Sequence, residues 1–311
     1  KNNSGINTEG SSILINFFKN LFNRLMHFLN FNSYSGARKN IYKHYDLGNE
    51  FYSLWLDKSL TYSSAIFDKS LTLGQGQYNK YKKLSKLINI KDGDKILEIG
   101  CGWGGFAEFI SKRFDVQLTS ITISKKQFDY AKKRIATAGL DDKVSIKLMD
   151  YRDLEGKYDK IISIEMFEAV GEHYWKVFFK KIKSLLKPSG IAGLQIITIK
   201  NNFFNNYKYK PDFIQKYIFP GGMLPSMEKL NEQFNSSDLQ MLGCSFFGND
   251  YAKTLSIWKK NFNNQWPQIS QLGFDENFKR LWNLYFSYCE GGFRGKSIDV
   301  CQLKLISGNK E

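Results

Sequence analysis

The sequence has few cysteines and no long uncharged apolar stretch, and each shortage excludes a class of protein. Its 311 residues include only Cys101, Cys244, Cys289 and Cys301, and no two of these form a C-x-x-C pair. Paired spacing is typical of zinc sites and disulfide-rich secreted domains, so we expect no metal and reduced thiols. No apolar run approaches the roughly 20 residues of a membrane-spanning helix. No secretory signal with a small-residue cleavage site is present either, and we expect a cytoplasmic protein.

Acidic residues are scarce relative to basic ones, which leaves a net charge of +15. Such an excess favours an anionic partner, whether nucleic acid, an acidic metabolite or an anionic lipid surface. The basic residues are scattered among Phe and Tyr, as in NNFFNNYKYK at 201–210, and form no arginine-rich arm. This pattern favours a peripheral position at the anionic inner face of a membrane, and we expect no nucleic-acid partner.

Apolar and aromatic residues are abundant. The hydrophobic fraction is 42%, with 26 Phe and 17 Tyr, enough for a large core and an apolar cavity besides. Residues 11–31 place apolar side chains at helical spacing, which predicts an amphipathic helix after a polar arm. Such a helix either packs on the main body or lies on a bilayer. We therefore divide the chain into an N-terminal arm and helix at 1–35 and one domain at 36–311.

Strand and helix patterns alternate between about residues 83 and 200. Short β-branched runs alternate with helical stretches at 125–139 and 173–190, the second of which ends with Pro and Gly. This alternation predicts an α/β fold with a doubly wound, Rossmann-like parallel sheet. The aromatic, basic and turn-rich segment at about 201–235 interrupts the rhythm and is expected to be a lid, while 297–306 reads as a closing strand.

A glycine-rich corner follows the first of these strands. Glu98, Gly100, Gly102 and Gly104 give E-x-G-x-G-x-G, which is neither the G-x-G-x-x-G of dinucleotide folds nor a P-loop. Glycines allow the backbone to turn sharply and to approach a ligand closely. The neighbouring Trp103 favours an apolar, uncharged ligand part over a pyrophosphate, although a tight turn without a ligand is the alternative.

Together with five other segments, this corner resembles the cyclopropane fatty acid synthase and mycolic acid cyclopropane synthase family of S-adenosylmethionine-dependent methyltransferases. The resemblance covers residues 37–303, and HYDLGN and YIFPGG are its most specific blocks. The matching segments are ARKNIYKHYDLGNEFYSLWLDKSLTYSSAIF, the corner, SITISKKQ, SIEMFEAVGEHYW, QKYIFPGGMLPS and YCEGGFRGKSIDVCQL.

The resemblance implies a class I methyltransferase sheet and a site for S-adenosylmethionine. Tyr62 and Ser63 should lie against its methionine end, and the corner should line it. Hydroxyl and amide groups after the second strand should bond the ribose, and an aromatic–basic pair after the third should lie beside the adenine. The implied cofactor residues are Tyr62, Ser63, Glu98, Gly100, Cys101, Gly102, Trp103, Gly104, Thr122, Gln127, Tyr151 and Arg152.

The resemblance also implies a reaction at the cis double bond of unsaturated phospholipid acyl chains. Methyl transfer to an alkene leaves a carbocation, from which a base must remove a proton before water adds. In the family this base is understood to be a bicarbonate ion, held by a carboxylate, a tyrosine, a histidine and backbone groups. Glu168 matches the carboxylate and Tyr285 the tyrosine, while Ser64 and Ile197 match the backbone contacts.

Three side chains depart from the family pattern near the expected base. Ser64 stands where the family has a cysteine, whose contribution comes from its backbone. The histidine of the fifth strand aligns with Gln195, which can donate a hydrogen bond but cannot carry a positive charge. The family's FEH is FEA here, with Ala169. Methyl transfer remains the expectation, but the product can be a cyclopropane, a methylene or a methyl branch.

An acyl chain also needs an apolar tunnel, for which the aromatic segments offer candidates that could equally be core. These candidates are Tyr45, Phe51, Tyr52, Trp55, Phe203, Phe204, Tyr217, Phe219 and Phe286. The alternative function is a small-molecule N- or C-methyltransferase like those of plant alkaloid synthesis, for which Glu168 and Tyr285 would not be needed as a base site. A homodimer is compatible with the sequence.

Overall fold

The computed structural model describes residues 47–68 and 71–308. The predicted helix at 11–31, the boundary at residue 35 and the tunnel candidate Tyr45 lie outside the described residues. Those expectations therefore remain predictions.

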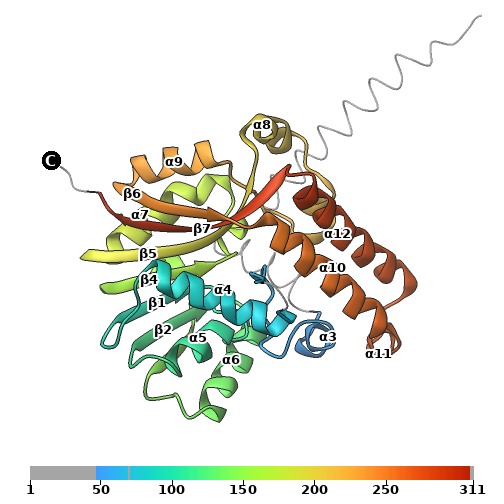
Figure 1. The fold of residues 1–311 in the computed structure, drawn as a ribbon, viewed down its shortest axis with the longest axis horizontal. Coiled ribbons are helices and arrows are strands. Elements are labelled where there is room, and N and C mark those ends of the chain that lie inside the picture. The colour runs from blue at the N-terminus through green and yellow to red at the C-terminus, as the bar shows by residue number, and fades with distance from the viewer. Residues whose placement is uncertain (1–46, 69–70, 309–311) are drawn as a thin grey trace, which may run out of the picture.

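Within these ranges, seven strands form one sheet in the order β3-β2-β1-β4-β5-β7-β6 (Figure 1). Strands β1 to β5 pair in parallel, and β7 is antiparallel to both β5 and β6. This arrangement confirms the expected doubly wound, Rossmann-like α/β sheet. The strands are β1 (Lys95–Ile99), β2 (Gln117–Thr122), β3 (Val144–Leu148), β4 (Tyr158–Ile164), β5 (Leu186–Ile199), β6 (Leu239–Phe246) and β7 (Ile298–Ser307).

Helices cover both faces of the sheet (Figure 1). One face buries its apolar residues under α4, α5 and α6, and the other under α7 and α9. Side-chain caps fix several helix starts: Thr72 and Gln75 form a capping box at α4, and Ser124 caps α6. The helices of these two layers are α4 (Leu73–Leu87), α5 (Gly105–Ser111), α6 (Lys125–Thr137), α7 (Trp175–Leu185) and α9 (Met227–Ser236).

A third layer, made only of helices, lies beside the sheet and has an aromatic core of its own (Figure 1). Phe51, Trp55, Trp258, Trp282 and Phe286 are fully or almost fully buried there, and many of the rings meet edge to face. Its helices are α3 (Asn49–Ser53), α10 (Gly248–Asn264), α11 (Trp266–Gln271) and α12 (Glu276–Arg294).

The expected insertion at 201–235 is mainly helical and packs beside the strand ends. It contains α8 (Asn201–Tyr209), the π-helical turn η4 (Ile214–Ile218) and most of α9. Three short 3-10 turns lie near the carboxyl ends of the strands, namely η1 (Tyr151–Asp153), η2 (Phe167–Ala169) and η3 (Glu172–Tyr174).

Two details differ from the sequence expectation. Strand β6 was not expected from the sequence. It is an edge strand that pairs only with β7, is partly exposed and carries a register shift near Gly243, so its sequence has no regular strand pattern. The helix expected at 173–190 ends at Leu185. Strand β5 begins directly at Leu186, so Pro188 and Gly190 lie in an irregular first part of that strand.

Candidate active site

The glycine corner follows β1 and has the backbone conformation that its sequence predicts. Gly100, Gly102 and Gly104 have φ of 90°, 50° and 81°, a region that side chains disfavour. A Cβ at Gly100 would lie 2.8 Å from Met166 Cγ, and one at Gly104 would lie 3.1 Å from Ala131 Cβ. At Gly102 a Cβ would meet no atom of the described residues within 4 Å. The corner is therefore closed by packing at its two ends and open at its middle glycine.

The other corner residues are buried and held by neighbours. The Glu98 carboxylate accepts a hydrogen bond from Ser120 Oγ at 2.6 Å, and burial raises its pKa to about 7. Burial also raises the pKa of the Cys101 thiol. Trp103 Nε1 donates to Asn49 Oδ1 at 2.8 Å, which ties the corner to α3.

A small cavity of about 80 Å³ lies beside the corner, at the carboxyl ends of β1 to β4. It is lined in part by Gly100, Thr122, Tyr151 and Arg152, four of the expected cofactor residues. Thr122 Oγ1 donates to Oε1 of the buried Gln127 at 2.9 Å. The two residues expected to bind the ribose are therefore hydrogen-bonded to each other. The cavity wall is mostly apolar, with Thr122, Asp150 and Arg152 as its polar members and Tyr151 as its aromatic one.

The acidic partner of Arg152 completes this cavity. The Arg152 guanidinium donates to both oxygens of Asp150, at 2.9 and 2.7 Å, and this pair is almost fully buried. The fixed guanidinium lies over the rings of Tyr151 and Tyr174. The predicted adenine side is therefore a rigid wall.

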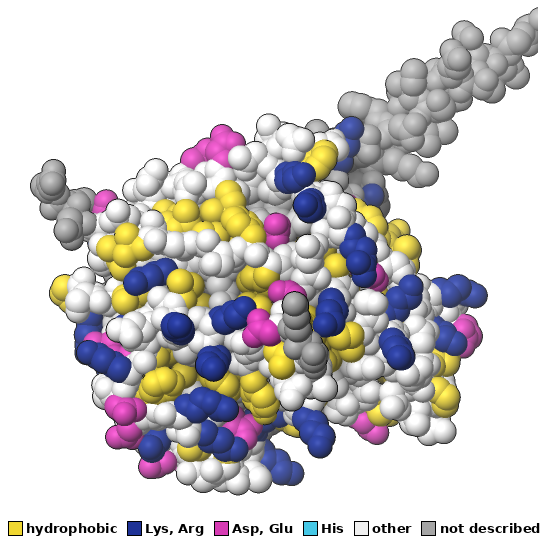
Figure 2. Space-filling view, viewed as in Figure 1, with side chains coloured by type: hydrophobic (Ala, Val, Ile, Leu, Met, Phe, Trp, Pro, Cys, Tyr) yellow, Lys and Arg dark blue, Asp and Glu magenta, His cyan; other side chains and the backbone are white. Residues whose placement is uncertain are grey.

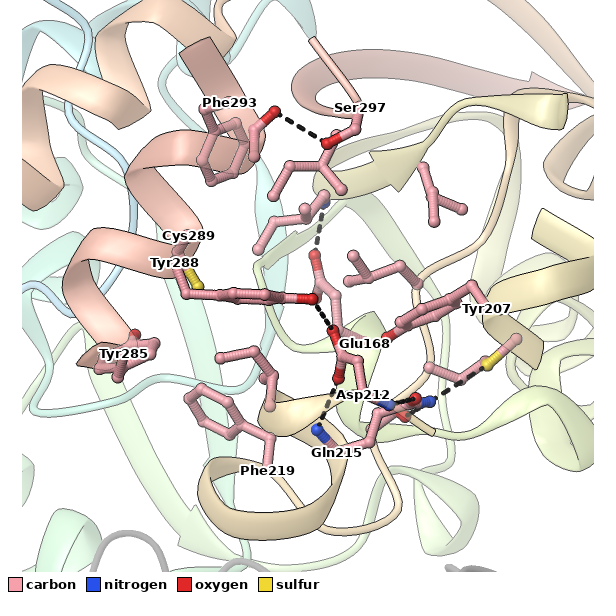
Figure 3. Close-up of a pocket in the computed structure, with 18 of the residues that line it drawn as sticks. Glu168, Tyr207, Asp212, Gln215, Phe219, Tyr285, Tyr288, Cys289, Phe293 and Ser297 are labelled. Atoms are coloured by element: carbon pink, nitrogen blue, oxygen red, sulfur yellow. Dashed lines mark hydrogen bonds between the residues drawn. The ribbon is translucent and has the colours of Figure 1, made fainter. Parts of the chain in front are cut away.

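A second, much larger cavity of about 760 Å³ lies between the sheet, the insertion and the helical layer. Tyr285 and Tyr288 of α12 lie on one side and Tyr207 of α8 on the other, with Glu168 between them (Figure 3). Most of its remaining wall is apolar, including Ile197, Ile199, Phe203, Phe219, Met223, Leu224, Leu255, Phe293 and Ile298. Its volume and apolar lining are typical of a ligand cavity.

The predicted tunnel residues divide into three groups. Phe203 and Phe219 line the cavity as expected. Tyr217 is 65% exposed, so its ring cannot form a tunnel wall. The other described candidates are buried core residues, which decides for the core alternative at Phe51, Tyr52, Trp55, Phe204 and Phe286.

Glu168 has one satisfied and one unsatisfied oxygen. It lies in η2, where Oε1 accepts the backbone N–H of Ile197 at 2.5 Å. Oε2 is buried without a hydrogen-bond partner among the described residues. Burial, together with the nearby Glu165 charge, raises the pKa of Glu168 to about 8. The predicted catalytic carboxylate thus has a free acceptor in a cavity that it lines.

Two tyrosines from distant segments meet at the same cavity. The hydroxyls of Tyr62 and Tyr285 lie 2.9 Å apart, and both residues line the cavity. Burial raises the pKa of Tyr285 well above its usual value, so this phenol stays neutral. The structure therefore brings an expected cofactor residue and an expected catalytic residue together.

Glu165 is a functional candidate that the sequence analysis did not identify. Its Oε1 accepts the backbone N–H of Ser64 at 2.8 Å and the Gln195 side-chain amide at 2.7 Å. Its Oε2 accepts the Tyr251 hydroxyl at 2.7 Å. Glu165 lines the large cavity, and its φ of 49° lies in the left-handed region that side chains disfavour.

Lys80 supplies a positive charge behind this carboxylate. Its ammonium group is fully buried and donates to Ser63 Oγ at 2.6 Å. Burial lowers the pKa of Lys80 to about 7, against the opposing effects of the Glu165 and Asp57 charges. Ser63 is therefore oriented by a side chain of α4.

Gln195 does not lie where the resemblance suggests. It is fully buried and absent from the cavity lining. Its Nε2 donates to Glu165, and its Oε1 accepts from Gln302 Nε2 at 3.0 Å. Gln195 is a support for Glu165, and the prediction that its amide faces a bicarbonate ion is not supported by this geometry.

The expected bicarbonate site can be tested against these contacts. Three of the donors that the resemblance assigns to the ion are the N–H groups of Ser64 and Ile197 and the Gln195 amide. All three donate to Glu165 or Glu168, so a bicarbonate ion could use them only by displacing these carboxyl groups. The fourth, the Tyr285 hydroxyl, contacts the Tyr62 hydroxyl. The donor set does not fit a bound bicarbonate.

A sequence signal existed for only one of the missed residues. Glu165 is a charged residue at the end of the apolar run DKIISIE, a place where strand-end side chains face ligands. Lys80 stands among Lys82 and Lys83 in an ordinary helical pattern. Only its packing distinguishes it from these solvent-facing neighbours.

Comparisons with known proteins identify a family and relatives with similar sequences. The family model described as mycolic acid cyclopropane synthetase matches residues 33–303. Tuberculostearic acid methyltransferase of Mycobacterium tuberculosis is 37% identical over 87% of this chain and 65% of its own length. Cyclopropane-fatty-acyl-phospholipid synthase of Escherichia coli is 37% identical over 86% of this chain and 67% of its own length. The chain thus spans about two thirds of the length of these relatives.

Solved structures show the same fold. Mycolic acid cyclopropane synthase CmaA1, in a complex with S-adenosylhomocysteine and CTAB, has a TM-score of 0.81 at 28% identity. The match covers 86% of this chain and 97% of that one. Cyclopropane synthase MmaA2 of Mycobacterium tuberculosis also has a TM-score of 0.81, at 27% identity and with the same coverage of both chains. This chain therefore belongs to the mycolic acid cyclopropane synthetase family of S-adenosylmethionine-dependent methyltransferases.

Proposed function

We propose that the protein transfers a methyl or methylene group from S-adenosylmethionine to the cis double bond of unsaturated phospholipid acyl chains, forming cyclopropane or methylated fatty acids. The observation that carries this proposal is the large apolar cavity, which contains a buried carboxyl oxygen of Glu168 without a hydrogen-bond partner among the described residues. The names of the two curated relatives refer to fatty acids, and that of the Escherichia coli enzyme to phospholipid acyl chains.

The cofactor would be held by the corner and the small cavity. Gly102 leaves room for close approach, Thr122 and Gln127 would face the ribose, and Tyr151 with Arg152 would face the adenine. When bound, S-adenosylmethionine supplies a methyl group on a positively charged sulfur, which an alkene carbon can attack. Tyr62, beside Tyr285, would border the methionine end and the acyl chain together.

The wall of the large cavity suits a reaction that generates positive charge. Glu165 and Glu168 place two carboxylates in a buried, largely apolar space, where charge interactions are strong. The surrounding apolar side chains exclude water, which would otherwise add to a carbocation. Tyr62 and Tyr285, which line the same cavity, present hydroxyl groups to it.

We further propose that the insertion is a lid that rests on an anionic membrane. Phe203, Tyr209 and Tyr217 on α8 and η4 are exposed, and Lys210 and Lys216 beside them are exposed as well. Aromatic rings with nearby lysines are typical of peripheral binding at a lipid surface. On the face seen in Figure 2, basic side chains are likewise scattered among hydrophobic ones.

Peripheral contact is also consistent with the lengths of the helices. Among the described residues no helix is both long and apolar enough to cross a bilayer. Binding to vesicles with anionic and with zwitterionic lipids would test the proposed contact. Replacing Tyr217 and Lys216 together should weaken anionic-vesicle binding, and so should deletion of residues 1–31 if the predicted helix is interfacial. Unchanged binding in both variants would contradict the contact.

The function itself is tested with lipids from cells that express the protein. Mass spectrometry should show monounsaturated phospholipid chains heavier by one CH2 unit, and NMR of the product distinguishes a ring, a methylene and a branch. Unaltered lipids together with methylation of a soluble amine would instead indicate a small-molecule methyltransferase.

A further inference from the structure

Two of the hydrogen-bond donors expected to hold bicarbonate, the Ser64 N–H and the Gln195 amide, point instead at the Glu165 side chain. Ser64 N–H and the Gln195 amide converge on its Oε1, and the Tyr251 hydroxyl meets its Oε2. These donors come from the segment before α4, from β5 and from α10, so three distant parts of the chain meet at one group. A carboxylate offers them the same planar pair of oxygens that bicarbonate would.

Charge also disfavours a separate ion at this place. Glu165 and Glu168 already line the cavity, and the Glu165 charge contributes to the raised pKa of Glu168. A bicarbonate ion beside the Glu165 carboxylate would be repelled by it, because buried like charges interact strongly. Lys80 is a nearby buried cation, and its ammonium group is bonded to Ser63.

We propose that the Glu165 carboxylate takes the place of bicarbonate in this protein and is the base that removes the proton from the methylated acyl chain. The proton step rests on the function proposed above. In it, a C–H bond of the new methyl group breaks and its electron pair forms the third bond of the ring to the cationic carbon. The proton is bound by Oε2 of Glu165. If a hydride shifts along the chain first, the same proton loss gives a methylene group.

Three properties of Glu165 fit this role. Oε2 accepts one hydrogen bond and keeps a lone pair for the proton. Burial raises the pKa of Glu165, which makes the carboxylate a stronger base. Its backbone has a φ of 49°, in the left-handed region, and such strain at a cavity wall is typical of a functional position.

The first test compares turnover of unsaturated phospholipid vesicles in bicarbonate-free buffer and after bicarbonate is added. The wild-type rate should be the same in both. A rate that rises several-fold with bicarbonate would overturn the proposal.

Substitutions at the base position sharpen this test. Glu165→Gly suits the positive φ and vacates the space of the carboxylate, so turnover should fall at least about 100-fold and partly recover with bicarbonate or formate. Glu165→Gln fills the same space, so it should lose turnover without recovery. Glu155→Gln, at an exposed position, is the matched control and should behave like the wild type. Turnover in Glu165→Gln close to that of the control would contradict the role.

A structural readout separates this inference from the proposed substrate. In a crystal structure of the S-adenosylhomocysteine complex grown with bicarbonate, Glu165 should still accept from Ser64 and Gln195. Bicarbonate on those donors, with Glu165 displaced, would refute the inference whatever the substrate is. Absence of any lipid product in both buffers would instead refute the proposed function, and the crystal structure would still decide the place of Glu165.

Discussion

The glycine corner and the reacting wall of the large cavity lie at the carboxyl ends of the neighbouring strands β1 and β4, but different forces hold them. The corner is one short loop shaped by its backbone, with three glycines at positive φ. The reacting wall consists of Glu165 and Tyr251, which line the cavity, with Ser64, Lys80 and Gln195 behind them. It joins groups from five segments by hydrogen bonds and charge. The corner should therefore be sensitive to added bulk, and the wall to altered polarity.

The largest expected effect comes from the unsatisfied carboxylate beside the wall. Glu168→Gln preserves shape but removes the carboxylate that forms above the Glu168 pKa of about 8 and would face the cationic carbon, so turnover at pH 9 should fall about 100-fold to 10,000-fold. The affinity for S-adenosylmethionine, measured by calorimetry, should hardly change if the corner binds the cofactor independently. A loss of S-adenosylmethionine affinity as large as the loss of turnover would show that Glu168 also supports the cofactor site, and the two regions would then not be independent.

The matching change in the corner adds bulk without altering charge. Gly100→Ala places a methyl group 2.8 Å from Met166 Cγ at a φ of 90°. It should lower the free energy of unfolding by about 2 kcal/mol and weaken cofactor binding. Gly139→Ala is the control, because Gly139 also has a positive φ but no atom of the described residues lies within 4 Å of the added carbon. Equal losses in both variants, measured by urea unfolding, would show that packing against Met166 is unimportant.

The pH dependence of stability separates the buried acids of the two regions. Glu98 and Glu168 have pKa values raised from 4.5 to about 7 and about 8, so the folded state binds protons that the unfolded state releases. Their stabilisation is complete below pH 4.5 and declines as pH rises, by about 1.4 kcal/mol per unit for each group.

Difference curves isolate each acid in this experiment. We take the free energy of unfolding of the wild type minus that of each variant. This difference should stop changing near pH 7 for Glu98→Gln, and it should stop changing near pH 8 for Glu168→Gln. Urea unfolding at a series of pH values measures both. Differences that do not vary with pH would mean that neither acid titrates on unfolding as its burial implies.

The smallest expected effect concerns the tyrosine pair that borders both regions. Tyr285→Phe removes the 2.9 Å contact with the Tyr62 hydroxyl, a neutral hydrogen bond of about 1 kcal/mol, so turnover should fall several-fold. Tyr158→Phe is the control, since its hydroxyl makes only a 3.4 Å contact with the Glu155 carbonyl, remote from the cavity. A 100-fold loss in Tyr285→Phe would assign this residue a direct part in the chemistry.

The same contrast decides what could be predicted from the sequence. The parallel strands and the glycine corner are encoded locally, by β-branched runs and by residues without a Cβ, and they were predicted correctly. Strand β6 was not, because an edge strand that pairs only with β7 needs no continuous apolar pattern. The predicted end of α7 was several residues too late, because Pro188 and Gly190, which suggested the helix end, belong to β5.

Residues of the candidate site could be predicted only where they belong to a recognisable sequence motif. Glu168 and Tyr285 were found through family motifs, and the structure places both at the large cavity. Glu165 depends on partners up to 101 positions away, and no spacing rule connects it to Ser64 or Tyr251. The burial of Lys80 is likewise a property of packing, which a single sequence does not specify.

The link between Gln302 and its two partners has a consequence for how the cavity opens. Gln302 Nε2 donates to Gln195 Oε1 and to the Lys80 backbone carbonyl, which fastens β7, β5 and α4 together behind the wall. The opposite side of the cavity consists of α8 and η4, short elements with exposed rings. We therefore expect α8 and η4 to move away from the rest of the cavity wall when the cavity opens, while the side fastened by Gln302 stays fixed. Release of the modified acyl chain, which is bulkier than the substrate, would then be the rate-limiting step of turnover.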